Sequence, residues 1–345
     1  MDRQKIQDLI TRIPKTEIHL HLEGLASVDT IWNLMQKHGL TPAGITSKEE
    51  LRTRFQVTSL DEFIDLFINV IQNSFSENED IELLIGDLRN YLNSNNIVYA
   101  EIFFAPSKFL MNGFSFEKMM SILDKGVESI RKKDKREVKF IIDVSRTSGV
   151  KNAENNLELT LEHRSGNIIG IGLGGTESKG PAKDFAHIFE KARKEGLNLV
   201  AHAGEVVGPE SVWDALNTLH AQRIGHGISS IFDKNLMDYL RDHRIPLEVC
   251  PTSNLFTRKF FRTLKDHPVK PFFDHGIFVT INTDDPSIFG KELVEEYMSL
   301  IDEEIFSVNE VITLIKNNLY ATFLPEDKKK LLWSEAEKAI NAFIK

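Results

Sequence analysis

The sequence predicts an α/β protein whose parallel strands close into a (β/α)8 TIM barrel, with extra helices after the first strand and at the C-terminal end. Eight strand-like runs alternate with helix-like runs along the chain. Several of these runs are nearly continuous in Ile, Val, Leu and Phe, as in parallel strands covered on both faces. Polar residues follow several strand ends, where the active sites of such barrels lie.

The eight expected strands lie between residues 17 and 282, and a helical pattern follows most of them. The clearest helical patterns cover 181–195 and 210–219, where apolar residues recur at helical spacing. Residues from 308 onward also have helical patterns. The expected strands are 17–22, 97–104, 138–144, 168–173, 197–202, 223–226, 246–250 and 277–282.

The longest departure from this alternation runs from about residue 27 to residue 95 and contains several predicted helices. Ser59 and Glu62 have the spacing of a capping box, which predicts a helix that begins there. One face of this helix is apolar, which indicates either core packing or a lid over the barrel mouth. Its residues are Leu60, Phe63, Ile64 and Phe67.

An open, doubly wound sheet is the alternative architecture. A dinucleotide-binding version needs a glycine-rich turn between its first strand and a helix. Here the first expected strand is followed by Glu23 and Gly24, and the glycine-rich run 170–175 begins inside a strand. No linker-like, low-complexity or repeated segment is visible, so we expect the whole chain, 1–345, to form one domain.

The composition is typical of a soluble protein. The chain has 345 residues, of which 41% are hydrophobic and 27% are charged, and its formal net charge is -9. This charge argues against a nucleic-acid surface, and no apolar run is long enough for a membrane span. We expect no signal peptide, and the single cysteine, Cys250, fits a reducing compartment. These features predict a cytoplasmic protein that acts on a small molecule.

His19 and His21 are the most informative residues. In an extended strand, residues two positions apart share a face, so we expect both imidazoles to point to the same place. Imidazole nitrogen is the commonest protein ligand of zinc. Taken alone, the pair also fits two polar strand residues that face solvent.

Further polar residues follow the fifth, sixth and eighth expected strands. Because the carboxyl ends of the strands meet at one face of a barrel, we expect these side chains to lie close to the histidine pair. They are His202, Glu205, His226, Asp284 and Asp285.

Three imidazoles and one carboxylate can hold one metal ion and leave a position for water, which indicates a catalytic site rather than a structural one. The candidate ligands are His19, His21, His202 and Asp284. Glu205 is then a candidate proton donor, and His226 and Asp285 remain to handle the water and hold the substrate.

The remaining titratable candidates have simpler explanations. No histidine is placed beside Cys250 by the sequence, so we expect a buried inert thiol rather than a nucleophile. The other histidines lie among charged neighbours, and we expect surface or helix-end positions for them. They are His38, His163, His187, His220, His243, His267 and His275.

Six segments together resemble the adenosine deaminase family of the amidohydrolase superfamily. They occur in the family's order from residue 14 to about residue 290, which makes the resemblance highly specific. The segments are PKTEIHLHLEG (14–24), GLGGTE (172–177), HAGE (202–205), RIGHG (223–227), CPTSN (250–254) and NTDDP (282–286).

The resemblance implies one zinc ion per chain, held by the four candidate ligands, and hydrolytic deamination of a 6-aminopurine. The resemblance also implies that His226 and Asp284 orient and deprotonate the water that attacks C6, and that Glu205 protonates N1. Asp285 holds N7, the backbone of Gly175 holds N3, and the apolar stripe matches the family's lid. The residues implied to bind the substrate are Gly175, Asp285, His21, Glu23, Leu60, Phe63, Ile64 and Phe67.

Glu23 departs from the family's pattern. Adenosine-specific members resemble one another in having aspartate here, which is thought to bind the ribose 5'-hydroxyl. We expect adenosine or deoxyadenosine as the substrate, with free adenine or 6-aminodeoxyfutalosine of menaquinone synthesis as the alternatives. If the strand alternation continues past His21, Glu23 points into the same pocket.

Three other classes of protein fit less well. Binuclear members of the superfamily need a carboxylated lysine at the end of the fourth strand, where this chain has Gly174 and Gly175. Base deaminases with cysteine-ligated zinc need a Pro-Cys-x-x-Cys segment, and this chain has one cysteine. A binding protein that has lost the metal would not retain all four ligands and Glu205. The sequence gives no indication of oligomeric state.

Overall fold

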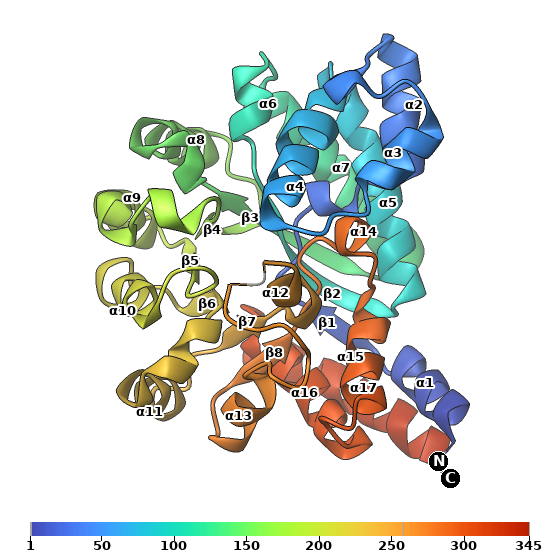
Figure 1. Ribbon diagram of the computed structural model, residues 1–345, viewed down its shortest axis with the longest axis vertical. Helices are drawn as coiled ribbons and strands as arrows, with labels where there is room; N and C mark the ends of the chain where they lie inside the picture. Colours follow the sequence, from blue (N-terminus) through green and yellow to red (C-terminus); the bar gives the residue numbers. More distant parts are fainter. Residues whose placement is uncertain (1, 258, 345) are drawn as a thin grey trace.

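In the computed structural model, eight parallel strands form one sheet in the order of the chain (Figure 1). The structure describes residues 2–257 and 259–344, apart from the side chains of residues 60, 61 and 344. The predicted TIM barrel is therefore confirmed. The strands are β1 (Lys15–Glu17), β2 (Ile97–Phe104), β3 (Glu137–Asp143), β4 (Ile168–Leu173), β5 (Asn198–Ala203), β6 (Arg223–His226), β7 (Leu247–Val249) and β8 (Val279–Ile281).

The first strand differs most from its expected bounds, because it ends at Glu17. The chain then runs between the segment after β8 and the end of β2. Leu20 forms an isolated parallel bridge with Asp284, and His21 forms one with Phe103. The N–H of His21 donates to the carbonyl of Asp284 at 2.9 Å. The metal-ligand candidates of this segment thus lie past the strand, at the seam that closes the barrel.

Helices cover the outside of the barrel, as the sequence pattern predicts (Figure 1). The insertion after β1 supplies α2 to α5, and α16 and α17 follow at the C-terminal end. The helices are α1 (Arg3–Arg12), α2 (Val28–His38), α3 (Lys48–Arg54), α4 (Leu60–Asp65), α5 (Ile81–Ser94), α6 (Ser107–Met111), α7 (Phe116–Asp134), α8 (Val150–Glu162), α9 (Ala186–Lys194), α10 (Pro209–Thr218), α11 (Lys234–Asp242), α12 (Pro251–Thr257), α13 (Val269–Asp274), α14 (Pro286–Phe289), α15 (Leu293–Asp302), α16 (Val308–Ala321) and α17 (Glu326–Ile344).

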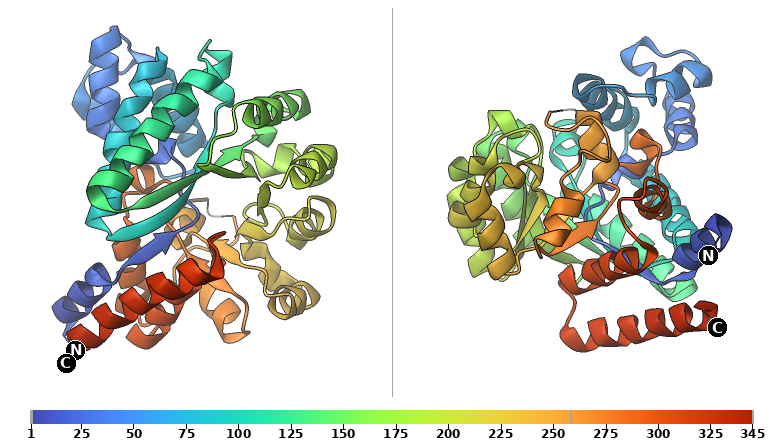
Figure 2. Two further views of the ribbon diagram at one scale, coloured as in Figure 1. Left: turned by 180° about the vertical axis from the view of Figure 1, so that it is seen from behind. Right: turned by 60° about the horizontal axis from the view of Figure 1, so that its bottom comes forward.

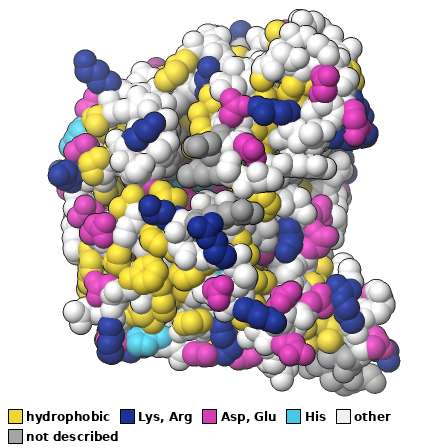
Figure 3. All heavy atoms as spheres, viewed as in Figure 1, with side chains coloured by type: hydrophobic (Ala, Val, Ile, Leu, Met, Phe, Trp, Pro, Cys, Tyr) yellow, Lys and Arg dark blue, Asp and Glu magenta, His cyan; other side chains and the backbone are white. Residues whose placement is uncertain are grey.

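The two ends of the chain lie together on one side of the barrel, where α1 and α17 run side by side (Figure 2). On the side viewed in Figure 1, the short helices α12 and α14 lie in front of the strands, and the space-filling view shows the surface hollowed near its centre (Figure 3). Within the part of the chain that is described, every helix is too short or too polar to cross a lipid bilayer.

The predicted capping box at Ser59 is formed only in part. The Ser59 hydroxyl accepts the N–H of Glu62 at 3.3 Å and begins α4. The Glu62 carboxylate instead accepts the N–H of Thr58 at 2.7 Å. Beyond α4 the helix widens over Leu66–Ile71 into a turn with π-helical hydrogen bonding, an irregularity frequent at functional sites.

A buried ion network crosses the interior of the barrel. Arg223 on β6 lies 2.5 Å from a carboxylate oxygen of Glu101 on β2 and 2.6 Å from one of Glu248 on β7. The hydroxyl of Tyr99 donates to Glu101 at 2.9 Å, and the ring of Phe323 covers the guanidinium at 3.9 Å. Charged groups that are buried away from water need partners of opposite charge. These pairings therefore join the three strands β2, β6 and β7.

We predict that Arg223→Met destabilises the fold strongly, because it leaves Glu101 and Glu248 buried without their cation. The free energy of unfolding should fall by about 3–5 kcal/mol, measured by urea denaturation. Arg193→Met, which removes an exposed arginine paired with Glu190, is the matched control and should leave the midpoint nearly unchanged. Equal midpoints for the two variants would contradict this role of Arg223.

Candidate active site

Four side chains converge where the strands end, and they are the four candidate ligands. Nε2 of His21 lies 3.2 Å from Nε2 of His202 and 3.2 Å from Oδ1 of Asp284. Nε2 of His19 lies 3.4 Å from the same oxygen. Zinc bonds of about 2 Å in a tetrahedral site place neighbouring ligand atoms roughly 3.3 Å apart, so these separations fit one ion.

The unpaired atoms of this cluster also fit a cation. Nε2 of His19 is buried and has no hydrogen-bond partner among the described atoms. Two imidazole nitrogens that face each other at 3.2 Å repel unless a proton or a metal ion lies between them. Three imidazoles and a carboxylate are the donor set of catalytic sites for zinc and related ions. The residues present therefore fit a divalent metal.

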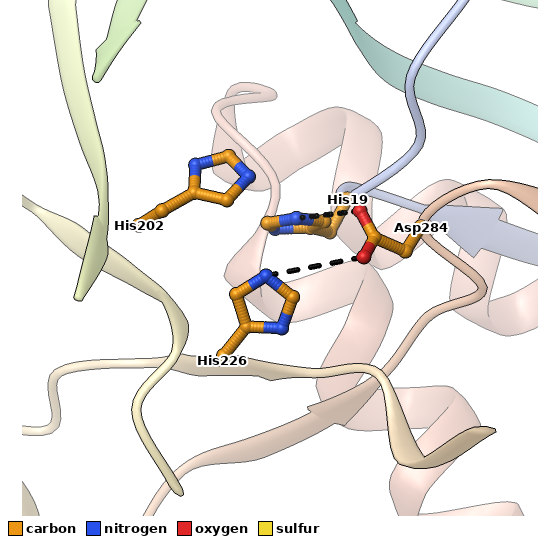
Figure 4. A group of neighbouring side chains, drawn as sticks. All are labelled: His19, His202, His226 and Asp284. Carbon is orange, nitrogen blue, oxygen red and sulfur yellow. Dashed lines mark ion pairs between the residues drawn. The ribbon is translucent and has the colours of Figure 1, made fainter. Parts of the chain in front are cut away.

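His226 lies beside this cluster (Figure 4). Its ring points toward His19, His202 and Asp284, and one ligand atom from each of the four residues lies within 4.8 Å of the others. However, Nε2 of His226 is 3.9 Å from Oδ2 of Asp284 and 3.7 Å from the carboxylate of Glu205. It faces the second oxygen of Asp284 across a gap that a water molecule can bridge.

The buried ion network reaches the cluster through His19. Nδ1 of His19 donates to Glu248 at 2.8 Å, and the other oxygen of Glu248 pairs with Arg223. This contact leaves the Nε2 lone pair of His19 directed at the cluster, as in carboxylate–histidine–metal arrangements. A Cβ at Gly225 would lie 2.7 Å from the His19 ring, so only glycine fits beneath it.

Other contacts fix the remaining ligands. The guanidinium of Arg146 donates to the carbonyl of His202 at 2.5 Å, and the hydroxyl of Ser253 donates to Oδ2 of Asp284 at 2.7 Å. The Glu17 carboxylate accepts both the N–H and the hydroxyl of Thr283, at 2.8 and 2.7 Å. Glu17 and Ser253 belong to the recognised segments, whereas no sequence spacing pointed to Arg146 or Glu248.

Two of these residues have strained backbones. His226 has φ +62° and Asp284 has φ +67°. Both values lie in the left-handed backbone region that residues other than glycine rarely adopt. His226 is the last residue of β6, and Asp284 lies three residues after the end of β8. The left-handed turn redirects each side chain to the barrel axis, and such strain persists only where surrounding contacts hold it.

Glu205 lies on the loop after β5, half-buried beside His226. Burial raises the pKa of its carboxyl group to about 8, and the negative charges of Asp284 and Glu177 add to this effect. A carboxyl group with such a pKa carries a proton at neutral pH and can donate it.

The loop that carries Glu205 is held by Glu177, a residue to which the sequence assigned no role. One oxygen of Glu177 accepts the N–H of Gly204 and the hydroxyl of Ser211, both at 2.5 Å. The other accepts the N–H groups of residues 205, 206 and 207 at 3.1, 2.8 and 3.0 Å. One carboxylate thus satisfies five donors and fixes the backbone of Glu205.

An amide fixes the orientation of His226. The side chain of Asn254 bridges Nδ1 of His226 at 3.0 Å and Nε2 of His267 at 3.3 Å. Burial lowers the pKa of both rings to about 3, so both are neutral. The surface position expected for His267 is wrong, because this ring packs in the interior behind the site. The residues just before it, Lys265 and Asp266, are polar and gave no sign of this contact.

The cluster opens into a cavity of about 480 Å³. Phe63, Ile64 and Phe67 line it, and the ring of Phe63 stacks on Phe289 with centroids 5.2 Å apart. The apolar stripe therefore forms part of the cavity roof, while the side chain of Leu60 lies outside the described residues. Gly175, with φ +90°, lines the wall.

Asp285 also lines the cavity, and its Oδ1 has no hydrogen-bond partner among the described atoms. Burial, with the neighbouring charge of Asp284, raises the pKa of Asp285 well above its usual range. A Cβ at Gly24 would lie 2.0 Å from this Oδ1, so the glycine makes room for the carboxyl group.

The alternation on which the expected direction of Glu23 depends ends at Leu22, because Glu23 begins a single helical turn, Glu23–Leu25. The buried side chain of Glu23 accepts the N–H of Ala105, a residue of the cavity lining, at 3.1 Å. Its second oxygen, Oε2, is buried and has no hydrogen-bond partner among the described atoms.

Comparisons with known proteins show the family and the fold of this chain. The profile of a family described as "Adenosine deaminase" matches residues 14–339. An aminodeoxyfutalosine deaminase of Streptomyces avermitilis is 35% identical over 99% of this chain and 96% of its own. The crystal structure of adenine deaminase from Arthrobacter aurescens has a TM-score of 0.90 and 27% identity, over 95% of this chain and 99% of that one. A Zn-bound amidohydrolase from Burkholderia ambifaria shares the fold, with a TM-score of 0.88 and 19% identity over 98% and 93% of the two chains.

We predict that Glu177→Gln loosens the loop after β5, because an amide NH₂ then faces N–H donors that had a carboxylate. The free energy of unfolding should fall by about 1–3 kcal/mol. Hydrogen exchange followed by mass spectrometry should show faster exchange in peptides that cover residues 203–207. Asp214→Asn, which changes an exposed carboxylate on α10, is the control; identical exchange in both variants would refute the anchoring role.

Proposed function

The chain belongs to the adenosine deaminase family, and on this premise we propose that it deaminates a 6-aminopurine that carries a large substituent on the ring, aminodeoxyfutalosine being the first candidate. At the coarser level the chain is a hydrolytic deaminase of a 6-aminopurine-type substrate. The finer choice of substrate is our proposal, with free adenine as the second candidate.

The size of the cavity is the observation that carries this choice. Cavities of about 300–1,000 Å³ enclose drug-sized ligands, and a bare purine is much smaller than such a ligand. The cavity of about 480 Å³ therefore leaves room beyond the base. Adenosine, the substrate first expected from the sequence, has less support, because the relatives compared above are deaminases of aminodeoxyfutalosine and adenine.

We assign the metal to one Zn²⁺, for which the donor set and the separations of the four ligand atoms are suited. Zinc supplies Lewis-acid activation of water at neutral pH. The residues that would hold it are His19, His21, His202 and Asp284.

The neighbouring side chains have complementary roles. His226, neutral and held by Asn254, accepts a proton from the water that adds to C6, and Asp284 orients that water through Oδ2. Glu205 donates a proton to N1, so that the ring accepts the electron pair. The amino group takes the proton held by His226 and leaves as ammonia, while the proton of the new C6 hydroxyl group passes to Glu205, so that a 6-oxopurine with a proton on N1 remains.

Recognition of the base falls to residues that line the cavity. We assign the hydrogen bond to N7 to Asp285, whose Oδ1 has no partner among the described atoms, and the hydrogen bond to N3 to the backbone of Gly175. His21 also lines the cavity. Phe63, Ile64 and Phe67 cover the base and exclude water from the reaction.

A substrate screen tests the proposal directly. Aminodeoxyfutalosine, adenine, adenosine and deoxyadenosine are each mixed with the enzyme, and loss of the 6-aminopurine absorbance is followed. We expect the highest kcat/KM for aminodeoxyfutalosine, because it fills the cavity. Preference for adenine or for adenosine would overturn the substrate assignment, and turnover of none of the four would overturn the proposed deamination.

We predict that Glu205→Gln removes the proton donor while the metal site stays intact. The value of kcat should fall about 100- to 10,000-fold. Metal analysis should find about one zinc per chain in both the wild type and the variant. Retained activity would refute the role of Glu205 as the acid, and loss of zinc together with activity would show that the variant acts on the metal site instead.

A further inference from the structure

One wall of the cavity is rich in hydroxyl groups. The loops after β2, β3 and β4 build it, and none of these loops supplies a metal-ligand candidate. Hydroxyl groups both donate and accept hydrogen bonds, which suits a sugar or another polar substituent. The residues are Ser145, Thr147, Ser148, Thr176 and Ser178, together with Ser107, whose hydroxyl is already hydrogen-bonded to α8.

The same wall carries Lys108, the one lysine or arginine that lines the cavity among the described residues. It is half-buried on α6 and forms no ion pair with any described side chain. Two acidic groups of the cavity have other partners: Asp143 accepts two backbone N–H groups, and Glu177 accepts five donors. Among the described residues, Lys108 is therefore a cation of the cavity that no carboxylate neutralises through an ion pair.

The backbone at Lys108 is anchored on both sides. Glu23 accepts the N–H of Ala105, just before α6. The hydroxyl of Ser107 donates to Asn152 at 2.7 Å and accepts from Asn156 at 2.8 Å, which fixes the start of α6 on α8. The ammonium group thus projects from a fixed base, which lowers the entropic cost of using it in binding.

We propose that Lys108 binds an anionic group, a carboxylate or a phosphate, at the far end of the substrate's substituent. This inference rests on the proposed function and adds the chemical class of the substituent. An uncharged substituent offers the ammonium group no counter-charge, whereas an anion in this cavity faces the carboxylates of Asp143, Glu177 and Asp284. A charge-assisted hydrogen bond to Lys108 offsets that repulsion and selects the anionic substrate.

The test compares anionic and neutral substrates in Lys108→Met. The ratio of kcat/KM for aminodeoxyfutalosine, which carries a carboxylate, to that for adenosine should fall about 10- to 100-fold, mainly through KM. Adenosine 5'-monophosphate in place of aminodeoxyfutalosine gives the phosphate arm. Lys108→Arg keeps the charge and should retain most of the ratio. Lys118→Met, which removes an exposed lysine of α7, should leave the ratio as in the wild type.

A binding measurement separates this inference from the proposed function. Calorimetry compares inosine 5'-monophosphate with inosine, and the deaminated product of aminodeoxyfutalosine with inosine, in the wild type and in Lys108→Met. The anion site is supported if at least one anionic ligand binds the wild type more tightly than inosine and loses this advantage in Lys108→Met, even if no compound is turned over. The ligand that shows this loss identifies the bound group as a phosphate or a carboxylate. Equal binding of charged and neutral ligands, or an equal loss for both in Lys108→Met, would overturn it.

Discussion

The pairing of Arg223 with Glu248 is the interaction on which the site depends. It lies inside the barrel, away from water, and the same carboxylate accepts Nδ1 of His19. A buried charge that loses its partner destabilises the fold strongly. The pairing therefore holds the strands that carry Arg223 and Glu248 in one register. The side chain of Glu248 therefore does two things. It pairs with the buried charge of Arg223, and it orients the imidazole of His19 for the metal site.

The seam between the first and last strands has a similar double role. Both strands are short, and the barrel closes there through the bridge of Leu20 with Asp284 rather than through a long ladder. Two metal-ligand candidates of the first segment and the strained Asp284 meet at this seam. Glu17 and Ser253 supply the hydrogen bonds that hold Asp284 and its neighbour Thr283. The seam has few strand-to-strand hydrogen bonds, and side chains from opposite ends of the sequence converge there.

The sequence predicted the barrel and the convergence of the ligand candidates, because parallel strands have a strong apolar pattern and strand ends share a face. It failed where a residue's partner lies far along the chain. Glu248 and Arg146 lie in runs without a motif, and His267 follows the polar residues Lys265 and Asp266 but has a buried ring. The period-two alternation expected to continue to Glu23 ends earlier, because a single helical turn forms where the chain leaves the seam. Such contacts follow from tertiary packing, which local patterns do not contain.

Lys108 and the groups that act on C6 follow different strands, but the loops around them are partly shared. The proposed metal ligands and proton-transfer groups follow β1, β5, β6 and β8, and the buried ion network and Glu177 hold them. Lys108 and the hydroxyl-rich wall follow β2, β3 and β4. The loops after β3 and β4 also carry Arg146, which donates to the carbonyl of His202, and Glu177, which holds the backbone of Glu205. A change at Lys108 can therefore alter which substituent is accepted while the groups that act on C6 keep their positions, whereas a change at Arg146 or Glu177 would disturb those groups as well.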